Sequence, residues 1–242
     1  ASVKSLRVPP ARLHPSDVTL PNGIRLIVQT ERTSATVTLL GSIKTQTQLQ
    51  TPAGKDGVSD VLEGLFSYGT KTLDRLAFQK ALDDIAASEN AGSNFRLKVL
   101  KQDFARGVEL LADNELHPAL PMDDFKVVQQ QTAQLSEGER QSPGYRTERA
   151  LVRALVPLGD PLLRETTPET IRSLKYEDIQ NYYNETFRPD LTTIVIIGDV
   201  TPDEARAAIE KWFGGWKAAG PRPKVVLPPV PGNKPSAVNV PD

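Results

Sequence analysis

The amino-acid sequence predicts an α+β fold, because helical and strand patterns alternate along the chain. In the clearest helix, residues 57–67, apolar side chains recur every three or four positions and form one stripe. Two later segments are typical of strands. Residues 95–100 alternate apolar and basic side chains, and residues 191–197 are nearly all Thr, Ile and Val, which is typical of a buried strand. At 242 residues, the chain can bury a sizeable core.

In the first half, two strands precede the clearest helix and a second helix follows it. The Asn22-Gly23 turn leads into the first strand, and Asp56 is the expected N-cap of the clearest helix. The expected strands are residues 24–29 and 36–44, the second helix is 73–87, a loop covers 45–56, and residues 88–94 lead into the strand 95–100.

In the second half, helices predominate and cap signals mark their starts. Asp103 and Pro121 each open a helix, the first ending at Leu116, and Thr167 is a further N-cap. Thr201 begins a capping box. The other expected helices are 151–156, 176–187 and 202–213, and the polar segment 136–149 is interrupted by a proline.

The predicted organisation is an extended lead-in, one domain and a linker. Residues 1–17 show little pattern, residues 18–217 hold every helix and strand, and residues 218–242 are rich in proline. Seven of the 20 prolines fall between Pro221 and Pro241, which is typical of a stiff, extended linker.

Composition excludes several classes of protein. The formal net charge is −1, from 29 basic and 30 acidic residues. The chain therefore lacks the excess of basic residues that is typical of nucleic-acid-binding proteins. No apolar run approaches the roughly 20 residues of a membrane-spanning helix. The chain has no cysteine, which excludes disulfides and thiolate zinc sites.

The segment 57–70 resembles the motif helix of the insulinase, pitrilysin and mitochondrial processing peptidase family. The resemblance rests on Gly57, Glu63, Phe66 and the Gly69-Thr70 pair, and two later segments, 110–125 and 188–216, also follow the family's pattern. Members carry an inverted zinc-peptidase motif, H-x-x-E-H. The resemblance implies an antiparallel or mixed sheet with helices packed on one face, as in one unit of the processing-peptidase-like metallohydrolase fold. Such units are usually paired, so the linker is expected to lead to a second unit.

Both motif histidines are replaced in this sequence. Asp60 stands where the first would be and Gly64 where the second would be, so we expect no metal site and no catalytic residue. The family's third ligand, a carboxylate, lies roughly seventy to eighty residues further on. Leu135 occupies that position, although a shifted alignment could place Glu137 or Glu139 there.

Two interpretations of the altered motif stay open. Asp60 and Glu63 form either a solvated helix face or a weak oxygen-ligand site for Mg²⁺ or Ca²⁺, the solvated face being the commoner case. Gly64 is either a tolerated substitution or makes room for a partner surface. The two histidines, His14 and His117, match no motif position, and a structural role is expected for both.

The pair Asn90-Ala91 is the candidate peptide-binding edge. In active relatives such a pair lies on an edge strand that adds an extended substrate to the sheet. Here Gly92 follows, and glycine weakens a strand, so a plain turn into the next strand is an equal alternative.

The resemblance therefore implies a non-catalytic unit of a zinc-metallopeptidase-family protein. It would help form a peptide-binding chamber with an active H-x-x-E-H half or subunit, and zinc is expected only in that partner. The alternatives are a scaffold or assembly module without a protease role and a residual metal-dependent peptidase. An exported or periplasmic bacterial location is favoured. Substrate, partner identity and oligomeric state stay open.

Overall fold

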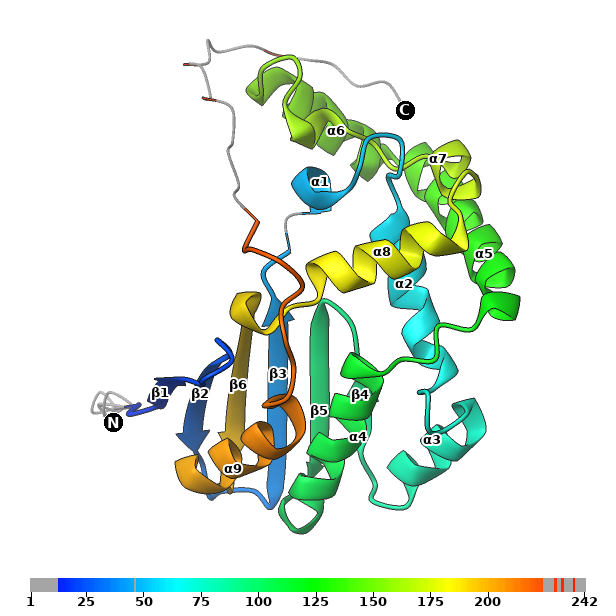
Figure 1. Cartoon of the computed structure of the whole chain (residues 1–242). Helices are drawn as coiled ribbons and strands as arrows, with labels where there is room; N and C mark the ends of the chain where they lie inside the picture. The colour runs from blue at the N-terminus through cyan, green and yellow to red at the C-terminus, as the bar shows by residue number, and fades with distance from the viewer. Residues whose placement is uncertain (1–12, 46, 224–228, 230–231, 233–236, 238–242) are drawn as a thin grey trace, which may run out of the picture.

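The structure is a computed structural model that describes residues 13–45, 47–223, 229, 232 and 237. Its centre is one six-stranded sheet with the strand order β1-β2-β6-β3-β5-β4 (Figure 1). β2 and β6 are parallel, and every other neighbouring pair is antiparallel, so the sheet is mixed, which is one of the two expected alternatives. The strands are β1 (Ser16–Thr19), β2 (Arg25–Thr30), β3 (Thr36–Ile43), β4 (Ser88–Asn90), β5 (Asn94–Leu100) and β6 (Thr192–Gly198).

Helices cover one face of the sheet. α4 packs on β5 and α9 packs on β2, and both lie in front of the sheet in Figure 1. A second group of helices is arranged around α2, which contacts α5 and α8, while α7 contacts α5. The helices are α1 (Thr47–Gln50), α2 (Val58–Leu65), α3 (Arg75–Asp83), α4 (Phe104–Leu116), α5 (Met122–Gln141), α6 (Pro143–Leu155), α7 (Pro168–Arg172), α8 (Tyr176–Thr186) and α9 (Pro202–Phe213). In the described part of the chain, none is long and apolar enough to cross a membrane.

The two faces of the sheet differ in burial because side chains alternate along each strand. On β5, Phe95 and Leu97 point into the core while Arg96 is exposed. β6 was expected as a buried strand, and one of its faces is covered: Ile196 is fully buried, and Ile197 is 42% exposed. An apolar run alone does not show whether helices cover one face or both.

Several local expectations prove wrong. The pattern assigned no element to residues 88–94, but Ser88–Asn90 form β4, an edge strand too short to show a pattern. The lead-in is expected to reach residue 17, but β1 begins at Ser16; residues 1–12 of the lead-in lie outside the described part. The polar segment 136–149 is helical, because α5 continues to Gln141 and α6 begins at Pro143 with Ser142 as its N-cap. Asp56 is not the N-cap of α2: it pairs with Arg164 at 2.9 Å.

The start of the proline-rich segment is held against the domain by one buried arginine. Arg188 is 2% exposed and forms an ion pair with Asp190 at 2.8 Å. Its guanidinium also donates hydrogen bonds to the backbone carbonyls of Ala219, Gly220 and Pro221, at 3.1, 3.3 and 2.9 Å. Most of the expected linker 218–242 lies beyond residue 223, outside the described part, so its extended character stays a prediction.

Candidate functional site

The motif helix α2 packs on α5 at its glycine. A Cβ atom on Gly64 would lie 2.7 Å from Val128 Cγ1 of α5, closer than real Cβ contacts come. Gly64 therefore allows the two helices to approach, which is a physical reason for glycine inside a helix, where it costs about 1 kcal/mol relative to alanine. The space at this position is filled by the protein's own α5.

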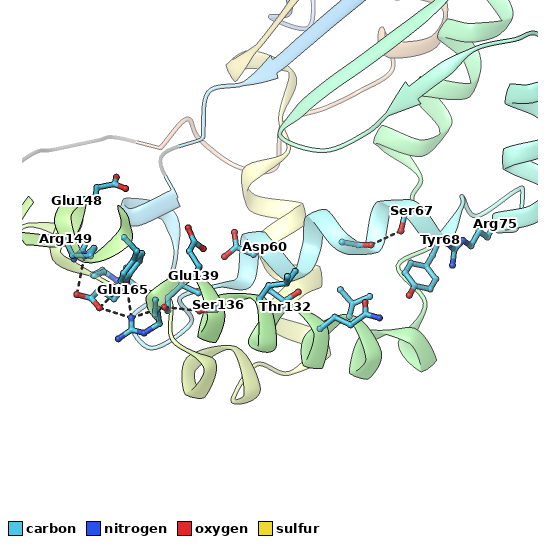
Figure 2. Close-up of a pocket in the computed structure, with 18 residues that line it drawn as sticks. Asp60, Ser67, Tyr68, Arg75, Thr132, Ser136, Glu139, Glu148, Arg149 and Glu165 are labelled. Carbon is cyan, nitrogen blue, oxygen red and sulfur yellow. Dashed lines mark hydrogen bonds and ion pairs between the residues drawn. The ribbon is translucent and has the colours of Figure 1, made fainter. Parts of the chain in front are cut away.

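A hollow of about 730 Å³ lies beside this contact, and Asp60 and Gly64 line it together with residues of α5, α6 and the segment 164–166. Figure 2 shows Asp60 and Glu139 in its middle, with Tyr68 and Arg75 towards one end. Arg149 and Glu165 lie towards the other end. The lining is mostly polar and contains no histidine.

The two acidic groups in the middle of the hollow come from α2 and α5. Partial burial raises the pKa of Asp60, and the negative charge of Glu139 raises it further. Of the three positions considered for a third ligand, Glu139 is therefore the carboxylate that faces the motif helix. Leu135 lines the hollow but is 74% exposed, and Glu137 lies 3.8 Å from Arg172.

Glu63 points towards the sheet. Its Oε1 accepts a hydrogen bond from the backbone N–H of Ser93 at 2.8 Å, and burial raises its pKa. The interpretation of Asp60 and Glu63 as one solvated face therefore suits the exposed Asp60 and is wrong for Glu63.

The Asn90-Ala91 pair lies at an edge of the sheet. β4 pairs only with β5, and Asn90 is its last residue. The Asn90 side chain donates to the carbonyls of Ala91 and Asn94, at 3.1 and 3.2 Å, and so closes the turn into β5. Ala91 is 5% exposed. The pair thus combines the two alternatives: Asn90 ends an edge strand, and the residues after it turn into β5.

The described histidines lie away from the motif helix. His14 and His117 are both exposed, and the backbone N–H of His117 donates to Asp113 O at 2.9 Å. Among the described residues, no group of three or more histidine, aspartate or glutamate side chains could hold a metal ion.

Sequence reasoning missed a cluster of three arginines on Glu165. Arg140, Arg149 and Arg153 contact its carboxylate at 2.8, 3.2 and 2.6 Å. Burial alone would raise the pKa of Glu165, but these guanidinium groups outweigh burial and lower it to about 2. The arginines come from two helices and the glutamate from a loop, so no spacing in the sequence could have indicated the cluster.

Sequence reasoning also missed Glu115, a fully buried carboxylate on α4. A signal was present: Glu115 follows the inward-facing Leu111 by four residues, and residues four apart share a helix face. Its Oε2 accepts a hydrogen bond from the backbone N–H of Gly92 at 2.8 Å.

Comparisons with known proteins show which family the chain resembles. A family model described as Peptidase M16 inactive domain matches residues 173–242. The uncharacterized zinc protease YmxG of Bacillus subtilis is 26% identical over 210 residues, covering 84% of this chain and 50% of the relative. The mitochondrial-processing peptidase subunit beta of Caenorhabditis elegans is 24% identical over 207 residues, covering 82% and 44%. The chain is therefore similar to proteins of the M16 peptidase family.

A solved structure supports the fold assignment. The peptidase M16 inactive domain from Pseudomonas fluorescens superposes with a TM-score of 0.78 at 15% sequence identity, covering 90% of this chain and 54% of that one. This likeness shows a shared fold. The chain spans about half the length of the curated relatives that it matches. The matches fit a non-catalytic unit of a zinc-protease family.

Proposed function

We propose that this chain lines part of a peptide-binding chamber, and that an H-x-x-E-H half or subunit supplies zinc and the catalytic groups. One observation carries the proposal. The hollow beside α2 is lined by Asp60 and Gly64, the two positions at which the sequence resemblance expects the motif histidines.

The residues present do not fit a catalytic zinc ion. Such sites use three protein ligands, commonly histidine nitrogens and one carboxylate. Here Asp60 and Glu139 offer oxygen atoms only, and Gly64 offers no side chain. A larger side chain at Gly64 would also collide with Val128. The site therefore lacks both the histidine ligands and the space for a larger side chain at position 64.

A peptide suits the same region better. The hollow is open and polar, with carboxylates in the middle and arginines towards its ends, so it can bind polar groups of an extended chain. Among the described residues, no strand pairs with the outer edge of β4, so a peptide could add there. α2 connects the two features, because Asp60 lines the hollow and Glu63 holds the turn after β4.

The test is to mix the purified chain with an H-x-x-E-H family protein from the same organism and to measure peptidase activity. Thr132 lines the hollow, whereas Gln134, on the same helix, is exposed and outside it. We expect the native chain and a Gln134→Trp variant to raise the activity equally. A Thr132→Trp variant, which fills the hollow, should raise it less.

Two outcomes would contradict the chamber. If mixing never changes the activity, the proposal fails. A stable complex with proteins that lack any peptidase motif would instead favour a scaffold or assembly module.

Exported or periplasmic expression of the native gene product, seen by cell fractionation, is part of the same proposal and is independent of the mixing result.

A further inference from the structure

Two carboxylates from two helices bind consecutive amides of one turn. Glu115 Oε2, on α4, accepts from the N–H of Gly92, and Glu63 Oε1, on α2, accepts from the N–H of Ser93, both at 2.8 Å. The turn directly follows β4, the edge strand that carries Asn90. The position of this edge therefore depends on both glutamates.

The two carboxyl groups lie close together. The Oε2 atom of Glu63 occupies the space that a Cβ atom on Gly92 would need, while the amide of the same glycine is bound to Glu115. The φ angle of Gly92 is +129°, which side-chain-bearing residues rarely adopt. Glycine is thus required at this point both by its backbone angle and by the carboxylate against it.

One oxygen of Glu115 lacks a partner. Glu115 is 0% exposed, and among the described residues its Oε1 is buried without a hydrogen bond. An unsatisfied buried oxygen is costly, and so is a second negative charge beside the first in a dry environment. A proton on Glu115 would remove both costs, because the acid could donate a hydrogen bond to its neighbour.

The charges around Glu115 favour that proton. The facing titratable groups are Glu63 from α2, Glu89 from β4 and Tyr183 from α8, whose hydroxyl donates to the Glu115 backbone carbonyl at 2.8 Å. No ion pair in the described part of the chain involves the three glutamates. Burial first, and then the two acidic neighbours, raise the pKa of Glu115 well above its ordinary value.

We propose that Glu63 and Glu115 share one proton and are positioning residues that hold the Gly92-Ser93 turn, and with it the peptide-binding edge of β4. The inference rests on the proposed function of that edge. It also gives a physical reason for a glutamate at position 63 without histidine neighbours, since this carboxylate binds the turn. Loss of the shared proton would place two charges side by side and loosen the turn.

The test on the native protein is amide hydrogen exchange of Gly92 and Ser93, followed by NMR from pH 5 to pH 9 and corrected for the intrinsic rate. Protection should fall by up to about tenfold per pH unit from the ordinary glutamate pKa until the raised pKa is passed, and then level off. Amides in the middle of β5 serve as the internal reference. Protection of the turn that does not depend on pH would overturn the proposal.

A Glu115→Gln variant separates the proton from the contact. Its amide can accept from Gly92 and donate to Glu63 at every pH, so the fall in protection should disappear. Glu109→Gln, on the same helix and with the same change of charge, should behave like the native chain. If Glu115→Gln does not fold, judged by thermal unfolding, Glu63→Gln makes the same comparison. A native-like fall in the substituted chain would also overturn the shared proton.

Peptide binding, measured by fluorescence anisotropy with a labelled extended peptide, distinguishes this inference from the proposed function. Binding to the native chain should weaken between pH 6 and pH 9, and binding to Glu115→Gln should not. If no peptide binds to either chain at any pH, the proposed function fails, while the exchange result still decides the shared proton. Equal binding at both pH values, together with pH-dependent exchange, would overturn the positioning role.

Discussion

Replacing Glu89 with glutamine should stabilise the protein at neutral and alkaline pH. Glu89 is a half-buried residue of β4 whose carboxylate accepts hydrogen bonds from Asn114 Nδ2 at 3.2 and 3.4 Å. Burial raises its pKa from 4.5 to about 7, although the hydrogen bonds to Asn114 act against this. The folded protein therefore retains a proton that the unfolded chain has already released.

The sign and size of the effect follow from proton linkage. Because the folded-state pKa is raised, the contribution of Glu89 to stability is complete below pH 4.5 and is lost as the pH rises to about 7. At 1.36 kcal/mol per pH unit, the loss is about 3 kcal/mol as an upper bound. Glutamine has the shape of the neutral acid and cannot ionise, so the Glu89→Gln variant should keep most of this free energy of unfolding at pH 8.

The assay is urea unfolding of both proteins at pH 5 and pH 8. We expect the variant to be more stable than the native protein by about 2–3 kcal/mol at pH 8 and nearly equal to it at pH 5. In a heating experiment at pH 8, a gain of this size would raise Tm by roughly 4–12 °C. Glu185→Gln, an exposed substitution with the same charge change, is the control. Equal stability of native and Glu89→Gln proteins at pH 8 would refute the reasoning.

Three further predictions concern helix packing, the arginine cluster and the linker. Gly64→Ala should destabilise the chain by about 1 kcal/mol, because the new methyl group would collide with Val128. In a double-mutant cycle, Val128→Ala should relieve part of this loss. If the two changes in the free energy of unfolding simply add, the contact is not the cause. Glu165→Gln should lower the free energy of unfolding by about 1–2 kcal/mol at pH 7. This difference should disappear as the pH falls from 4.5 towards 2, because the arginines stabilise only the ionised carboxylate, whose pKa they lower. Urea unfolding at pH 7 and pH 3 measures the difference, and equal losses at both pH values would contradict the prediction. Arg188→Met should speed proteolysis near Ala219, and an unchanged cleavage rate would show that the buried guanidinium does not hold the segment.

Local structure was predictable where it depends on a pattern within one element. The stripe of α2 and the cap of α9 at Thr201 match the structure, because helix periodicity and capping involve residues a few positions apart. β4 was missed because a three-residue edge strand is stabilised by pairing with β5 and not by its own alternation. The length of α5 was missed for a different reason: its buried face includes the polar residues Gln129 and Ser136, so it shows no continuous apolar stripe.

The sequence by itself determined the α+β class, the family resemblance, with its expected antiparallel or mixed sheet and helices on one face, and the presence of Asp60 and Gly64 at the two histidine positions of the motif. Only the tertiary structure decided which groups meet. Glu139, and not Glu137, faces Asp60, and Glu63 binds the turn after β4 together with Glu115. Periodicity assigns a residue to a face of its own helix, but the partner of that face depends on how distant segments pack. Contacts between α2, α4, α5 and the sheet edge are therefore absent from any local pattern.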